Sequence, residues 1–193
     1  MPVLTIFAGP NGSGKSSLIR QVEFEGRGNL LEPDAIARRM NPETPQRAGL
    51  SAGREVLLRT AEYIRNAESF AIETTLAGGW TNSAIGAALE RLFFTRLFYV
   101  CLDNPERSIQ RVRERVAQGG HDVPDADVRR RYTRSLTNAS HVLQLVHHGL
   151  VFDNSGAEPR PVFEIRGGRV LSLTDKIPEW AAVLLERNTR LRE

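Results

Sequence analysis

Eight consecutive residues near the start of the chain form a pattern that binds phosphate. Positions 9 to 16 read Gly-Pro-Asn-Gly-Ser-Gly-Lys-Ser, which fits the pattern G-x-x-x-x-G-K-[ST] of a phosphate-binding loop. Glycines let backbone N–H groups close around a phosphate, Lys15 can reach the outer phosphates, and the Ser16 hydroxyl can ligate a magnesium ion. We therefore expect ATP and Mg2+ as cofactors. The residues predicted to bind them are Gly9, Asn11, Gly12, Ser13, Gly14, Lys15, Ser16 and Ser17, with Ser16 as the metal ligand.

The residues on either side of this loop have the patterns that the motif requires. Residues 3–8 form a short apolar run suited to a buried strand, and residues 17–22 begin a helical pattern. Strand, glycine loop and helix in that order are the setting of a nucleotide-binding loop. Of 26 basic residues only Lys15 and Lys176 are lysines, so a chain rich in arginine keeps a lysine where a flexible ammonium group is needed. We prefer this interpretation to a glycine-rich turn that binds nothing.

Length and composition are those of one ordinary globular domain over residues 1–193. The single cysteine, Cys101, excludes an internal disulfide and lies in an apolar run, where a buried thiol is expected. The N-terminal apolar run is too short for a secretory signal, and the run over 92–102 is interrupted by Arg96 and cannot span a bilayer. We therefore expect a cytoplasmic protein that has no membrane contact.

Apolar strand-like runs alternate with helical patterns along the chain. The expected strands cover residues 3–8, 29–34, 70–73, 96–103 and 150–153, and the expected helices cover 17–22, 48–68, 82–92, 104–118 and 128–147. Gly167-Gly168 lies between two further short runs and signals a hairpin. With a closing helix, this hairpin occupies about 160–190. The alternation predicts an α/β fold of the P-loop kinase type, with a mostly parallel five-stranded sheet flanked by helices.

Polar side chains end the second and third expected strands, at the edge where a parallel sheet binds its ligands. Asp34 follows the second strand, and Glu73 precedes Thr74 and Thr75 at the end of the third. Asp34 could accept a proton from an acceptor hydroxyl during phosphoryl transfer, or it could cap the helix that begins at Ala35. The sequence leaves both interpretations open. An unpaired acid at the end of an apolar strand is costly, so Glu73 is expected to contact ligand or metal.

Arginines gather after the fourth expected strand. Arg107, Arg111 and Arg115 are spaced to lie along one helical face, and a second group over 129–134 follows the glycine-bearing loop 119–124. A helix, a loop and another arginine-rich helix over about 105–135 fit a mobile lid, whose closure would bring guanidinium groups onto a transferring phosphoryl group.

A solvated surface is the alternative for most of these arginines. Acidic residues lie near them in the sequence and could be their partners: Glu106, Glu114, Asp125 and Asp127. We expect only two or three of the arginines to touch a ligand. His121, in the loop between the two helices, and Arg54, at the start of the helix over 48–68, are weaker candidates for binding the acceptor.

Together these residues resemble the zeta-toxin group of P-loop small-molecule kinases, the toxic half of bacterial toxin–antitoxin pairs. The resemblance rests on segments 8–17, 32–37, 72–75, 111–115, 119–124, 129–132 and 151–156, within residues 1–156. It implies roles for individual positions: Asp34 as general base, Glu73 and Thr75 as acceptor ligands, Arg115 and Arg131 on the γ-phosphoryl group beside the catalytic Lys15, and Asn154 near the adenine. It also implies a nucleotide sugar, UDP-N-acetylglucosamine, as an acceptor and an antitoxin protein as a partner. The Gly-Gly-His-x-Val-Pro loop of the lid departs from the zeta-toxin pattern.

Two other functions compete with that of a phosphotransferase. A nucleotide-hydrolysing switch or motor is disfavoured because the sequence has neither an N-K-x-D guanine signature nor an L-S-G-G-Q segment. A nucleic-acid end kinase or binding module is suggested by the arginines, but Tyr132 is the only aromatic residue among them, and a stacking platform needs more. We therefore predict ATP-dependent transfer of the γ-phosphoryl group to a hydroxyl of a small molecule, with nucleic acid an unlikely partner.

Overall fold

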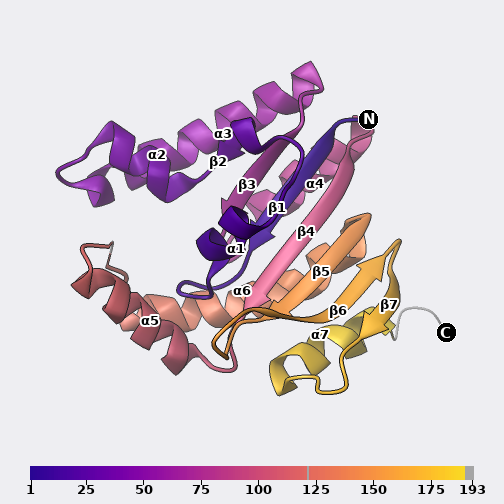
Figure 1. Cartoon of the computed structure of the whole chain (residues 1–193). Helices are drawn as coiled ribbons and strands as arrows, with labels where there is room; N and C mark the ends of the chain where they lie inside the picture. Colours follow the sequence, from indigo (N-terminus) through magenta and orange to yellow (C-terminus); the bar gives the residue numbers. More distant parts are fainter. Residues whose placement is uncertain (121, 190–193) are drawn as a thin grey trace.

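The computed structural model describes residues 1–120 and 122–189, and its centre is a single seven-stranded sheet (Figure 1). The strands lie in the order β2-β3-β1-β4-β5-β6-β7. Their bounds are β1 Val3–Ala8, β2 Leu30–Leu31, β3 Phe70–Thr74, β4 Phe94–Cys101, β5 His148–Asp153, β6 Arg160–Arg166 and β7 Arg169–Leu173. The first five strands pair in parallel, and β6 and β7 pair antiparallel. The predicted parallel sheet with helices around it is confirmed.

The predicted count of five strands is wrong, because the C-terminal hairpin joins the sheet. β6 pairs along the whole of β5, from His148 opposite Arg166 to Asp153 opposite Arg160. Without it β5 would be an exposed edge with a row of unpaired backbone groups, which proteins avoid. Phe163 and Ile165 of β6 are buried in the same core as the parallel strands. Pairing to β5 therefore extends both the hydrogen-bonded ladder and the apolar core.

Helices follow the strands as the alternation predicted. Their bounds are α1 Lys15–Gln21, α2 Pro33–Met40, α3 Gly49–Asn66, α4 Trp80–Glu90, α5 Pro105–Ala117, α6 Asp125–Leu145 and α7 Glu179–Thr189, with short 3-10 helices η1 Arg27–Asn29 and η2 Pro45–Ala48. Pro105 is in the first turn of α5, where the missing N–H costs nothing, and Asn104 caps this helix by accepting from the backbone N–H of Arg107 at 2.8 Å.

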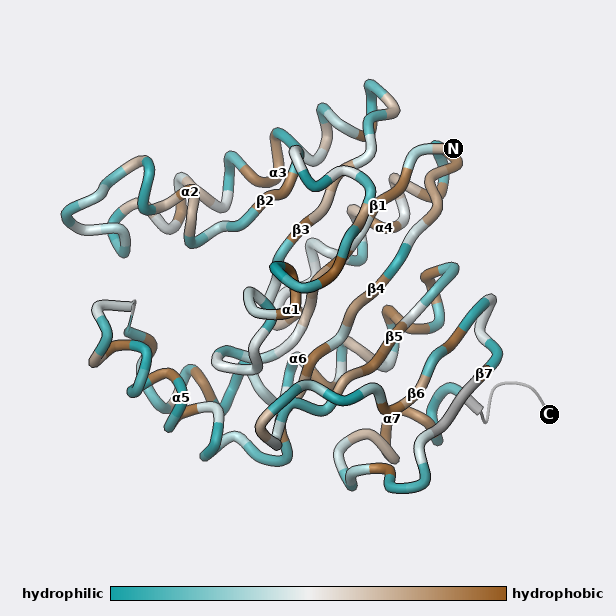
Figure 2. Tube along the Cα trace, in the orientation of Figure 1, coloured by the Kyte–Doolittle hydropathy of each residue, from teal (hydrophilic) through white to brown (hydrophobic). Residues whose placement is uncertain are grey.

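The two faces of the sheet carry separate apolar cores. On one face Phe7 of β1 stacks on Phe98 of β4 with ring centroids 5.0 Å apart, and Leu18 and Ile19 of α1 cover them. The other face is larger, and α3, α4, α6 and α7 all contribute to it. Alternate residues of β1 point to opposite faces, as a strand requires: Ile6 belongs to the larger core and Phe7 to the smaller. Figure 2 shows apolar residues along the strands.

The helices α5 and α6 form a unit with an apolar contact of its own. Ile109 and Val112 of α5 are buried against Val123 and Val128, at and just before the start of α6. A hydrogen bond also joins α6 to the sheet. The hydroxyl of buried Tyr132 donates to the carbonyl of Leu102, directly after β4, at 2.7 Å. The predicted lid segment is therefore anchored through α6.

Two sequence expectations about local environment can be checked here. Cys101 is fully buried as expected, and its burial raises the pKa of the thiol to about 12. In the described part of the chain, no helix combines the length and the apolar character that crossing a membrane requires.

Candidate functional site

The phosphate-binding loop lies between β1 and α1, where the sheet core holds it in place. Gly9 and Gly14 have φ angles of 149° and 98°, which side chains rarely tolerate. A Cβ atom at Gly9 would overlap the carbonyl of Val100, and one at Gly14 would overlap the side-chain amide of Asn154. Both glycines are therefore required by close packing as well as by backbone conformation.

Asn154 braces this loop from the end of β5. Its buried side chain donates from Nδ2 to the carbonyl of Ser13 at 2.8 Å, and its backbone N–H donates to the carbonyl of Cys101 at 2.9 Å. The amide thus joins two segments 141 residues apart in sequence. Asn154 also lines the cavity above the loop, and its predicted place near the adenine stays a prediction.

Lys15 is held inside the loop that contains it. Its Nζ donates to the carbonyls of Gly9 and Pro10 at 2.9 and 3.1 Å, and it lies 3.7 Å from Oε1 of Glu73. Burial lowers the pKa of the Lys15 ammonium, and the carboxylates of Glu73 and Asp34 oppose that shift. The ammonium group is thus held within the loop, and its predicted contact with the outer phosphates stays a prediction.

Two carboxyl groups meet beside Ser16. The Ser16 hydroxyl donates to Oε2 of Glu73 at 3.4 Å, so Glu73 contacts the loop, and its predicted contact with ligand or metal stays a prediction. Glu32, at the start of α2, faces Glu73. The pKa of the Glu32 carboxyl is raised, mainly by burial and also by the charge of Glu73 and a hydrogen bond with it. Hydroxyl and carboxylate oxygens are the ligands that Mg2+ prefers, so the residues around Ser16 fit the predicted metal.

A cavity of about 1150 Å³ opens above the loop. Its lining includes Asp34, which follows β2, and Thr75, which follows β3. Arginines of α5 and α6 line it as well. Asp34 is not the cap of its helix. The N-cap position of α2 is Glu32, so Asp34 lies in the first helical turn, with an exposed side chain that makes no hydrogen bond or salt bridge to any described residue.

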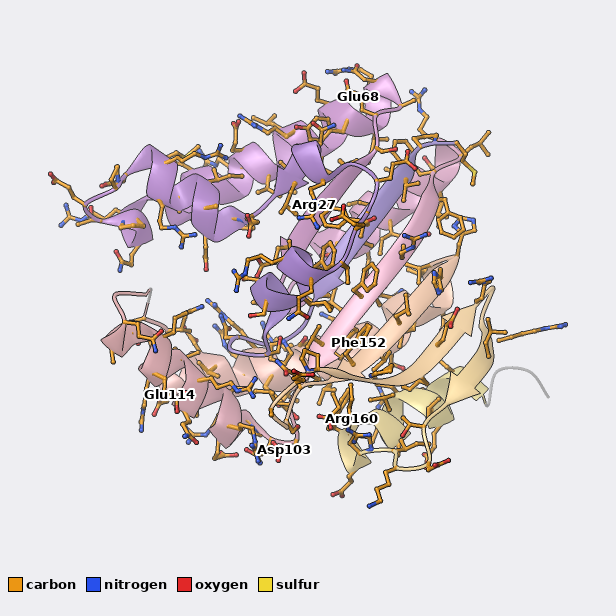
Figure 3. All side chains as sticks on the ribbon, in the orientation of Figure 1. Arg27, Glu68, Asp103, Glu114, Phe152 and Arg160 are labelled. Carbon is orange, nitrogen blue, oxygen red and sulfur yellow. The ribbon has the colours of Figure 1, made fainter. Side chains whose placement is uncertain are left out.

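Seven of the eight arginines of the α5–α6 pair divide into two groups. Four of them form ion pairs with nearby acids: Arg107 with Asp103, Arg113 with Asp125, Arg129 with Glu106, and Arg130 with Asp127. Three others line the cavity, namely Arg111, Arg115 and Arg131. The expectation that two or three arginines face the ligand site agrees with this division. Figure 3 shows Glu114 on α5 and Asp103 at the start of that helix.

Not every predicted residue comes to this cavity. The side chain of Arg54 is exposed on α3 and does not line the cavity. His121 lies outside the described residues. Tyr132, whose hydroxyl is bound to the carbonyl of Leu102, is buried in the core and cannot stack on a base. Whether nucleic acid binds to α5 and α6 stays a prediction.

The comparison with known proteins bears directly on this architecture. Residues 4–137 match the sequence profile of a family described as AAA domain, over more than half of the chain. The chain belongs to the AAA domain family. A relative from Haemophilus influenzae, an uncharacterized protein, is 32% identical over 126 residues, which are 65% of this chain and 89% of the relative.

Solved structures with the same fold come from toxin–antitoxin systems and related complexes. A chain of the PezAT chromosomal toxin–antitoxin system of Streptococcus pneumoniae superposes with a TM-score of 0.63 and 14% identity, covering 100% of this chain and 88% of that one. A chain of the AvrRxo1-ORF1:-ORF2 complex solved with ATP gives a TM-score of 0.69 at 14% identity, covering 100% of this AAA domain protein and 65% of that chain. This AAA domain therefore has a P-loop kinase-like fold that is shared with these two solved structures.

Three residues at or near the site were not predicted from the sequence. Glu32 carries the same signal as Asp34, an acid after a short strand, but the spacing does not reveal that it faces Glu73. Trp80 begins α4 and lines the cavity, half-buried, and its indole N–H donates to none of the described residues. Arg111 was placed on the correct helical face but was not selected among its neighbours. An aromatic residue directly after Gly78-Gly79, at a helix start, was a signal that could have identified Trp80.

Proposed function

We propose that this protein is an ATP-dependent phosphotransferase that transfers the γ-phosphoryl group to a hydroxyl of a small molecule. One observation carries the proposal: the Asp34 carboxylate, without a hydrogen-bond partner among the described residues, lines the same cavity as Lys15 and three arginines of α5 and α6. Phosphoryl transfer needs positioned cations and a proton acceptor for the attacking hydroxyl.

The proposed reaction assigns each side chain one task. Asp34 accepts the proton of the acceptor hydroxyl while the hydroxyl oxygen bonds to the γ-phosphorus of ATP. The bond between the γ-phosphorus and the β–γ bridging oxygen breaks, and ADP leaves. Lys15, with Arg115 and Arg131, stabilises the negative charge on the phosphoryl oxygens. Thr75 and Glu73 are positioned to orient the acceptor. A magnesium ion at the Ser16 hydroxyl would neutralise charge on the β- and γ-phosphates.

The α5–α6 pair acts in this proposal as a lid over the nucleotide. Three lid arginines line the cavity, whereas their neighbours are held by acids of the same two helices. Gly119 and Gly120, between the helices, give the backbone freedom that a moving segment requires. The resemblance to zeta toxins also suggests a partner, an antitoxin protein that covers the cavity. It suggests UDP-N-acetylglucosamine as an acceptor, which is therefore included among the acceptors tested below.

Product formation with ATP, Mg2+ and a panel of sugar acceptors tests the proposal. We expect a phosphorylated acceptor, and we expect Asp34→Asn to reduce the transfer rate by about 100-fold or more, within the range of general-base catalysis. ATP affinity should change little, because Asp34 does not contact the loop. Asp127→Asn is the matched control, since that carboxylate pairs with Arg130 on the surface. ATP hydrolysis that is indifferent to every acceptor and to Asp34→Asn would contradict the proposal.

A further inference from the structure

We propose that the acceptor extends past Asp34 into a second cavity, which binds a neutral or amine-bearing sugar unit and disfavours a diphosphate. The inference rests on the proposed function in one respect, that the reacting hydroxyl lies at Asp34. It adds the place and the chemical class of the part of the acceptor that does not react.

The second cavity adjoins the first at Asp34. It has a volume of about 490 Å³ and shares Pro33 and Asp34 with the larger cavity above the phosphate-binding loop. Sites for small organic ligands have volumes of roughly 300 to 1000 Å³, so the space suits a sugar-sized group attached to the reacting unit. A ligand that places a hydroxyl at Asp34 can therefore continue into this cavity without crossing the polypeptide.

Its walls come from two parts of the chain that face each other across the site. Figure 1 shows α2 and the end of α5 on opposite sides of this space. The α2 side continues through a turn in which Thr44 donates its backbone N–H to Oδ1 of Asn41 at 2.9 Å, between two prolines that restrict the backbone. The hydrogen bond and the prolines restrict the backbone of this wall.

The opposite wall is bare backbone at the tip of α5. Gly119 has a φ angle of 85°, and a Cβ atom there would meet nothing within 4 Å. A Cβ atom at Gly120 would lie 2.8 Å from the carbonyl oxygen of Arg115, so this position excludes side chains. The glycines keep the cavity open on the lid side, and their backbone N–H groups donate to the carbonyls of Val116 and Arg115 at 2.9 Å.

The charges of the lining select the ligand. Two carboxylates, Asp34 and Glu43, line the cavity with one guanidinium, that of Arg38, which gives a net charge of −1 when all three are ionised. Arg38 is also shared with a shallow pocket that contains Glu32. The larger cavity, by contrast, has five cations, Lys15 and four arginines, against four carboxylates, which gives a net charge of +1 when all are ionised. Phosphates are bound by clusters of cations and N–H groups, whereas carboxylates accept hydrogen bonds from hydroxyl and ammonium groups. The second cavity therefore suits a polyol or an amino sugar.

Binding of three two-unit acceptors tests this assignment. The probes are the disaccharide of glucosamine, which is cationic, its di-N-acetylated form, which is neutral, and UDP-N-acetylglucosamine, which is anionic. Affinities would be measured by calorimetry with the full-length protein, Mg2+ and a non-hydrolysable ATP analogue, so that no turnover is needed. We expect the cationic disaccharide to bind about tenfold more tightly than UDP-N-acetylglucosamine, because several surface charge contacts each contribute two- to fivefold.

Variants locate the binding to the second cavity. Gln46→Trp would fill the cavity from η2 and should weaken binding of both disaccharides about tenfold or more, while Arg47→Trp, at the neighbouring exposed position that does not line the cavity, should change it less than twofold. Glu43→Gln should weaken the cationic disaccharide two- to fivefold and leave the neutral one unchanged.

The outcomes separate this inference from the proposed function. Tighter binding of UDP-N-acetylglucosamine, binding of none of the three probes, or equal effects of Gln46→Trp and Arg47→Trp would each overturn the inference. Phosphorylation of an acceptor in those cases would leave the phosphotransferase proposal standing. Conversely, cavity-dependent binding without any phosphorylated product would support the inference about the cavity and count against the proposed reaction. If Gln46→Trp fails to fold by circular dichroism, Glu43→Gln carries the test.

Discussion

The contact between Asn154 and the phosphate-binding loop makes a quantitative prediction. Asn154→Ala removes the buried hydrogen bond from Nδ2 to the carbonyl of Ser13, which is 2.8 Å long. A buried carbonyl left without its donor costs about 1 to 3 kcal/mol, which corresponds to a decrease of about 2 to 12 °C in Tm for a chain of this size. Because the lost contact holds the loop, we also expect weaker ATP binding, although no contact of Asn154 with ATP is assumed.

The same contact predicts coupling with Gly14. A Cβ atom at Gly14 would overlap the Asn154 amide, and the φ angle of 98° is itself unfavourable for alanine. In the wild-type background Gly14→Ala adds both penalties, whereas in the Asn154→Ala background only the backbone penalty, about 1 to 2 kcal/mol, remains. The two substitutions should therefore be less harmful together than the sum of their separate effects, by roughly 0.5 to 3 kcal/mol.

A double-mutant cycle measures this coupling. Urea unfolding would give the free energy of unfolding for the four proteins, and calorimetry would give their ATP affinities. Asn154→Asp is the control for shape, because it retains the volume of the side chain but replaces the donor with a second acceptor facing the Ser13 carbonyl. Additive effects within about 0.3 kcal/mol, or a stable Asn154→Asp variant, would refute the reasoning that Asn154 acts by supporting the loop.

Two further predictions follow from the charges of the site. Arg131→Ala should reduce the rate of phosphoryl transfer about 100-fold or more, as loss of a charge-stabilising donor does. Arg130→Ala is the control and should change this rate less than twofold, because Arg130 pairs with Asp127 on the surface. Equal losses in the steady-state rates of the two variants would contradict the division of the arginines into cavity-lining and paired groups. Burial and the neighbouring Glu73 raise the pKa of Glu32, so the folded protein holds this proton more tightly than the unfolded chain does. Stability from this group is fully present below the ordinary glutamate pKa and is lost as the pH rises through the raised value. In the Glu32→Gln variant, the free energy of unfolding should therefore fall less steeply with pH between the ordinary and the raised pKa. Urea unfolding at several pH values measures this dependence. The same pH dependence in wild type and variant would count against the prediction.

The local parts of the fold could be predicted from the sequence. The loop over 9–16 is a contiguous pattern, and its glycines and lysine have requirements that are set by a phosphate and by adjacent backbone. Helix and strand positions were predictable because side-chain periodicity reports burial on one face, as in the alternation of Ile6 and Phe7 between the two cores. The start of α5 could likewise be predicted from Asn104 and Pro105, because capping depends on residues a few positions apart.

Contacts between distant segments could not be predicted in this way. Sequence spacing placed Arg107, Arg111 and Arg115 on one helical face, yet Arg107 turns to Asp103 and to the carbonyl of Ser155, whereas the other two line the cavity. The proximity of Glu32 to Glu73 depends on the parallel pairing of β2 with β3. The pairing of the C-terminal hairpin to β5 was missed for the same reason, since a strand edge is defined only after the sheet has assembled.

The sequence by itself thus determined that this protein binds a nucleotide and has a P-loop kinase-like α/β fold, because both follow from short-range patterns. Only the tertiary structure decided which arginines face the nucleotide cavity, that Asn154 supports the loop, and that Asp34 lies between two cavities of different charge. The physical reason is that these properties depend on which surfaces are buried together, and burial of one segment against another is not encoded in the spacing of either segment alone.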